Sequence, residues 1–256
     1  MCIRDRPWLD RFSALIERAV PERGPVLTRH LDTSVTELSP VAVEASRRTL
    51  REILGVVAEI GLDLVDGRGV AAARAALLEG AGRALADTRA FMSRIRSAPG
   101  AQAEHQRHLA ALHAADHLDR LIAACGEAAG EQVAADGALQ SAALELRRAL
   151  IAVLEWPGTA TSPLDAVETI SRSLAGARHT HRQALLERTA GGLVDPEVAS
   201  RQLEAARWID RVAYHVWRAV VHLDDARMSN GAGTSEVHEE ADAADAARAP
   251  LPPAAQ

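Results

Sequence analysis

The second half of the chain carries a clear helical pattern of apolar positions. Between residues 196 and 227, large apolar side chains recur every three or four residues, which places them on one face of a helix. These residues are Ile209, Val212, Val216, Val220 and Leu223. An earlier segment repeats the pattern with Leu118, Leu121, Ile122 and Cys125. Both segments are therefore predicted to be amphipathic helices with one buried stripe.

Three predicted helix starts share one local sequence feature. Ser39, Ser162 and Asp195 each precede a proline, so the polar side chain can accept a free backbone N–H while proline takes the first helical position. Glycine- and proline-containing pairs interrupt the pattern elsewhere. A shorter amphipathic helix is expected over 8–20. The six longer predicted helices span 40–65, 70–97, 101–128, 138–155, 163–190 and 196–227.

One short segment occurs twice. The run from His117 to Ala124, HLDRLIAA, is echoed 91 positions later by the run from Trp208 to His215, WIDRVAYH. Each copy lies in the third of three predicted helices, and a repeat of this kind indicates two related units. We therefore predict an all-α helical bundle made of two tandem three-helix units joined by short loops.

The repeated apolar-acidic-Arg-apolar run resembles the segment that ends each half of PhoU-domain proteins. Residues 214–223, YHVWRAVVHL, are similar to the ending of the PhoU-like cytosolic tail of bacterial sodium/phosphate cotransporters. Residues 30–32 followed by 39–45 resemble the entry into that tail. Residues 7–12 followed by 16–21 resemble the linker after the last membrane span of such a transporter.

This resemblance covers roughly residues 7–228 and implies a domain organisation. The first six residues look like an artefactual start, so the chain is expected to be a fragment. The acidic, Ala- and Pro-rich end of the chain cannot bury enough apolar surface to fold and is expected to be disordered. The predicted divisions are 1–6, a linker over 7–38, three-helix units over 39–128 and 129–228, and a tail over 229–256.

The resemblance also implies a function. It suggests the cytosolic regulatory domain of a sodium-dependent phosphate transporter whose membrane part is missing, located on the cytoplasmic side of the plasma membrane. The expected partner is a membrane transporter domain, on the same polypeptide or on a separate one, and a homodimer is possible. We expect no enzymatic activity and no cofactor. The alternatives are a free-standing PhoU-like adaptor, a helical-bundle metalloprotein and an oligomerising scaffold.

PhoU-like proteins carry a metal motif in which a second acid follows the first by four residues, so that both carboxylates face one cation. The first acid is present in both repeats, as Asp119 and Asp210. Ala123 and Tyr214 stand at the second position, so we expect the inherited metal site to be lost. His215 and Arg218 are further positions that match the family ending.

A replacement metal site is the alternative. His113, Asp116 and Asp119 are spaced three residues apart on one helical face, and His117 lies nearby. Imidazole and carboxylate together can hold zinc or iron. A solvated polar face is the simpler interpretation, and we expect no bound metal.

Composition narrows the remaining possibilities. The net charge is −6, and the last 28 residues hold five acids and one base, so the rest of the chain is nearly neutral. This argues against a nucleic-acid partner, which needs a basic face. Cys2 and Cys125 are too few for a disulfide framework or a Cys-rich zinc site. The last predicted helix presents three arginines opposite its apolar stripe, interpreted as surface residues: Arg207, Arg211 and Arg218.

Overall fold

The computed structural model describes residues 26–96, 101–159 and 161–224. In this part of the chain every regular element is a helix, which confirms the all-α prediction. Three 3-10 turns are η1 (Thr33–Val35), η2 (Gly137–Leu139) and η3 (Trp156–Gly158). The α-helices are α2 (Ser39–Val65), α3 (Ala71–Met92), α4 (Gln102–Cys125), α5 (Ala129–Val133), α6 (Gln140–Glu155), α7 (Leu164–Ala190) and α8 (Pro196–Leu223). The predicted helix at 8–20 and the predicted disordered tail lie outside the described residues.

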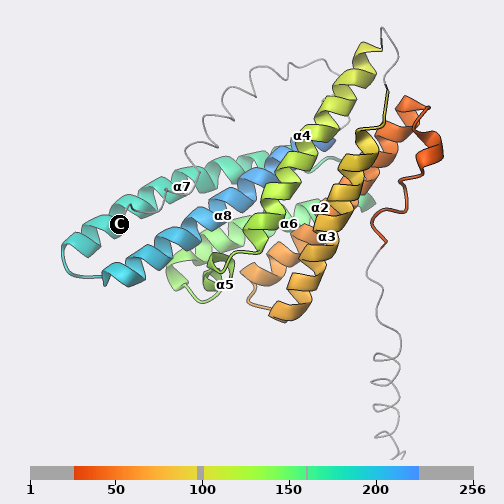
Figure 1. The fold of residues 1–256 in the computed structure, drawn as a ribbon. Helices are drawn as coiled ribbons and strands as arrows, with labels where there is room; N and C mark the ends of the chain where they lie inside the picture. The colour runs from red at the N-terminus through yellow and green to blue at the C-terminus, as the bar shows by residue number, and fades with distance from the viewer. Residues whose placement is uncertain (1–25, 97–100, 160, 225–256) are drawn as a thin grey trace, which may run out of the picture.

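The helices pack in two groups that share a long interface. Helices α2, α3 and α4 contact one another, and so do α6, α7 and α8. Between the groups, α4 packs along α8 and α2 packs along α6. Figure 1 shows α7 and α8 side by side, with their connected ends reaching beyond the other helices. The division of the chain into two PhoU-like units remains a prediction.

Helix α8 lies at the centre of this arrangement. It contacts α4, α7, α5, α6 and α2. The predicted stripe from Ile209 to Leu223 is buried, as are several polar residues of the same helix. Because neighbours surround its second half on more than one side, the buried surface there is wider than the apolar stripe.

The helix starts agree only in part with the predicted caps. Asp195 caps α8 as expected, accepting the backbone N–H groups of Glu197 and Val198 at 2.8 and 3.3 Å. Ser39 does not cap α2, since it is itself the first helical residue and is buried. Before α7, Ser162 accepts the N–H of Leu164 at 3.3 Å, and the helix begins one residue later than predicted.

The helix ends also show differences. The predicted helix over 101–128 is wrong at its end, because α4 stops at Cys125 and the short α5 follows. Its C-cap Gly126 donates to the carbonyls of Ile122 and Ala123. Between α2 and α3, Gly67 and Gly69 adopt φ values of 64° and 81°, which only glycine takes up without strain. The segment is thus a tight turn between helices.

No helix in the described ranges is long and apolar enough to cross a lipid bilayer.

Candidate functional site

The two repeated segments meet face to face along α4 and α8. The indole Nε1 of Trp208 donates to the carbonyl oxygen of Ala124 at 2.7 Å. At the other end of the repeats, Nδ1 of His117 lies 3.2 Å from Nδ1 of His215. The first residue of each repeat therefore contacts the last residue of the other, so the two copies run antiparallel. This contact, which we call the α4–α8 seam, brings His117 together with Tyr214 and His215.

Trp208 anchors one end of the seam. Its side chain is fully buried and its only polar atom, the indole N–H, is satisfied by the Ala124 carbonyl. Gly130 on α5 lies against the ring, and a Cβ at this position would come within 2.8 Å of Trp208 Cζ2. The close approach of α5 to α8 therefore depends on a residue without a side chain.

Four histidines gather at the other end of the seam. The His117 ring stacks on that of His222 with centroids 5.7 Å apart and planes within 11° of parallel. His113 also stacks on His222, with ring centroids 5.2 Å apart. His215 contacts His117, and one of these two imidazoles has to carry its proton on Nδ1 for the 3.2 Å contact to be a hydrogen bond.

This environment disfavours a charged His117. Burial lowers the pKa of His117 to about 2, and the neighbouring His215, His222, Arg218 and Arg120 add to the effect. A protonated imidazole here would lose its hydration and face further positive charge. His117 is therefore neutral at physiological pH in the folded chain.

The aspartates of the two repeated segments lie in different environments. Asp119 is exposed and pairs with Arg89 on α3, with 3.4 Å between the nearest nitrogen and oxygen. Asp210 is buried and pairs with Arg178 on α7 at 3.2 Å. Each carboxylate thus pairs with an arginine. Asp119 belongs to α4 and Asp210 to α8.

The candidate metal ligands are not brought together. Asp116 is exposed and pairs with Arg120 on its own helix at 3.2 Å. Asp119 pairs with Arg89 instead, and His113 turns toward α8 to stack on His222. Among the described residues, no three His, Cys, Asp or Glu side chains form a group that could hold a metal ion.

The prediction that Arg218 is a surface residue is wrong. Arg218 is 1% exposed, and its guanidinium carbon lies 5.5 Å from the centre of the Trp217 ring. Tyr214 is also buried and contacts the rings of His215 and Trp217. Both are buried because neighbouring helices cover α8 on more than one side. Arg211, by contrast, stays partly exposed and pairs with Glu127.

One functional-site residue was missed in the sequence. Arg47 on α2 is fully buried and donates from its two terminal nitrogens to the carbonyl oxygens of His222 and Leu223, each at 2.9 Å. Arg51, one turn on, also donates to Leu223 at 2.8 Å. The signal was present, because Arg47 occupies a place in the apolar stripe of α2 between Val43 and Leu50.

These contacts fix the C-terminal end of α8 against α2. The last carbonyls of a helix have no partner within it and carry partial negative charge, so guanidinium groups stabilise them. Through Arg47 and Arg51, α2 holds the C-terminal turn of α8, which also carries His222. The seam is thus fixed at one end by Trp208 and at the other by Arg47.

No protein-family model, curated protein or solved structure matches this chain.

Proposed function

We propose that the chain is a PhoU-like regulatory module of phosphate uptake, which acts by contact with a membrane transporter rather than by catalysis. The observation that carries the proposal is the α4–α8 seam, where two similar segments, each in the third helix of its group, pair antiparallel. An internally duplicated helical bundle is what the resemblance to PhoU-domain proteins implies. The membrane-side location and the transporter partner belong to this proposal.

The seam residues support a contact-driven mode of action. Asp119 and Asp210 are engaged by Arg89 and Arg178, so the carboxylates hold helices of their own bundle together. A regulatory module of this kind biases a transporter when its contacts differ between the transporter's two states. The exposed outer surface of the bundle would make these contacts, while the seam keeps the helices in register.

Phosphate uptake by the cells that encode the chain tests the proposal. Uptake of radiolabelled phosphate is measured after growth in high and low phosphate, for the wild type, for a deletion of the coding segment and for Trp208→Ala. We expect the deletion and Trp208→Ala to lose the dependence of uptake on growth phosphate. Leu193→Ala, at a residue that is 76% exposed, is the matched control and should behave as wild type. A deletion strain with unchanged uptake and regulation would overturn the proposal.

The regulatory module can be the tail of a transporter or a free-standing adaptor. An epitope tag in the acidic region over 229–256 distinguishes these two forms by the size of the tagged polypeptide. A transporter tail gives a tagged membrane-bound polypeptide much larger than this chain. The free-standing adaptor gives a tagged band of the mass of this chain, which copurifies with a separate transporter.

A further inference from the structure

A pocket of about 910 Å³ opens on the side of the molecule formed by α2, the end of α6 and the segment before η1. This volume falls in the range of about 300–1,000 Å³ that is usual for small-molecule sites in proteins. Much of the wall is apolar, and its members come from three separate parts of the chain. They are Leu27, Leu54, Val153, Leu154, Trp156 and Pro157.

Gly55 gives the pocket its depth. It lies in the middle of α2 and lines the pocket, and a Cβ built on it would meet nothing within 4 Å. Glycine is among the poorest helix formers, and no neighbouring helix approaches closely enough to require it here. The missing side chain leaves open space that a ligand can fill.

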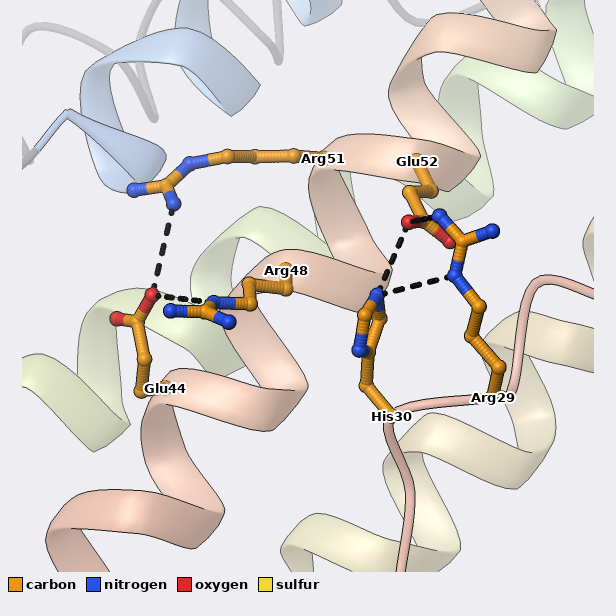
Figure 2. A network of polar contacts seen from close by, with 6 residues as sticks. All are labelled: Arg29, His30, Glu44, Arg48, Arg51 and Glu52. Atoms are coloured by element: carbon orange, nitrogen blue, oxygen red, sulfur yellow. Dashed lines mark hydrogen bonds and ion pairs between the residues drawn. The ribbon is translucent and has the colours of Figure 1, made fainter. Parts of the chain in front are cut away.

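Several basic side chains line the pocket. Arg29, Arg48 and Arg51 all line it, together with His30. Figure 2 shows how they are arranged around two carboxylates. Glu52 forms ion pairs with Arg29 and His30. Glu44 forms ion pairs with Arg48 and Arg51, with nitrogen–oxygen distances of 3.1 and 3.9 Å.

Two of these arginines are largely exposed to solvent. The side chains of Arg29 and Arg48 are 60% and 61% exposed. Arg48 donates to Glu44 through Nε, and its two terminal nitrogens take no part in that hydrogen bond. A guanidinium fork of this kind fits a carboxylate or phosphate group. Arg51 lies over the Trp156 ring at 5.5 Å, so a basic side chain also contacts the apolar wall.

From this arrangement we infer that the pocket is a binding site for an amphipathic monoanion, a medium-chain carboxylate with its apolar body over Gly55 and its head group at Arg48. The apolar wall removes the chain from water, which supplies most of the binding free energy. Arg48 selects the charge of the head group. The exposed Glu59, one turn beyond Gly55, disfavours a second negative charge at the far end. The site is separate from the α4–α8 seam and does not depend on the proposed role in phosphate uptake.

Calorimetric titration of the full chain with decanoate, below its micelle concentration, tests the inference. We expect saturable binding of one equivalent. Gly55→Phe fills the pocket and should weaken binding at least tenfold, whereas the matched Gly55→Ala should change it less than threefold. Thermal unfolding monitored by circular dichroism shows that each variant is folded.

The head group is tested with a variant on the exposed rim that does not affect packing. Arg48→Gln should weaken decanoate binding at least threefold and leave the binding of the uncharged decanol unchanged. Butyrate, which has the head group without the chain, should bind at least tenfold more weakly than decanoate. The inference is overturned if decanoate does not saturate, if folded Gly55→Phe binds it as tightly as the wild type, or if decyltrimethylammonium binds equally well.

Discussion

Arg47 on α2 donates a hydrogen bond of 2.9 Å to the carbonyl oxygen of Leu223, the last residue of α8 and 176 positions away. A second bond of the same length reaches the carbonyl of His222. The arginine is completely buried, so both bonds form away from water. These bonds link the beginning of the described chain to its end.

Arg47→Met should lower the free energy of unfolding by about 3 kcal/mol, because the change removes the charged donor of the buried His222 carbonyl and leaves the Leu223 carbonyl with Arg51 alone. Arg48→Met is the matched control, since the adjacent arginine is largely exposed and a surface change of this kind costs about 0.5 kcal/mol or less. Urea unfolding followed by circular dichroism measures both. Equal stability of the two variants would contradict the role assigned to Arg47.

Two glycine-to-alanine changes should have opposite effects. Gly130→Ala brings a Cβ within 2.8 Å of the Trp208 ring and should destabilise the fold by about 1–3 kcal/mol, as overpacking does. Gly176→Ala lies inside α7 with nothing within 4 Å of the new Cβ, and should stabilise by about 0.5–1 kcal/mol through helix propensity. Thermal melts of the two variants check the signs. A stabilising Gly130→Ala would mean that α5 does not lie against Trp208.

The free energy of unfolding should decrease as the pH is lowered, because of His117. Its pKa is about 2 in the folded chain and ordinary in the unfolded chain, so the unfolded state binds the extra proton. The stabilisation is fully present above about pH 6.5 and is lost as the pH falls, by about 1.4 kcal/mol per pH unit. Urea unfolding at several pH values between 7.5 and 5 measures this slope.

His117→Gln should reduce that slope by the contribution of about one proton taken up on unfolding, because the amide does not become charged. The exposed His179 on α7 provides the control, and His179→Gln should follow the wild-type curve. If His117→Gln keeps the wild-type slope, then His117 is not the group that resists protonation.

The Cys125 thiol should be almost unreactive in the folded chain. It is buried, and burial raises its pKa to about 12, with the charge of Glu127 adding to the effect. Thiolate is the reactive form, so modification has to wait for local opening. In a Cys2→Ser variant, reaction with an aromatic disulfide reagent should be many times slower than in denaturant. Rapid modification without denaturant would show that the end of α4 is open to solvent.

Much of the fold could be predicted from local pattern. The apolar stripe of α8, its Asp195 cap and the glycine turn before α3 are each determined by residues close in sequence, and the structure has all three. The break after Cys125 was missed because the alanine- and glycine-rich segment that follows is compatible with a helix. Ser39 failed as a cap because the helix begins one residue earlier than the proline position implied.

The site was less accessible to sequence reasoning, because it depends on which helices meet. A polar residue inside an apolar stripe can mark either a surface position or a buried bond. Arg218 was assigned to the surface, but it is buried because several helices cover α8. The histidines of α4 were considered as metal ligands with nearby aspartates, whereas their partners are His215 and His222 on another helix.

The antiparallel seam is the kind of contact that a twofold homodimer makes, in which one surface meets a second copy of itself. Here both surfaces belong to one polypeptide. In a homodimer every substitution appears on both sides of the axis at once, but a covalent link between the copies removes that constraint. The aspartates of the two segments illustrate the result, since Asp119 is exposed and Asp210 is buried. The two segments can therefore differ residue by residue while they still pack against each other.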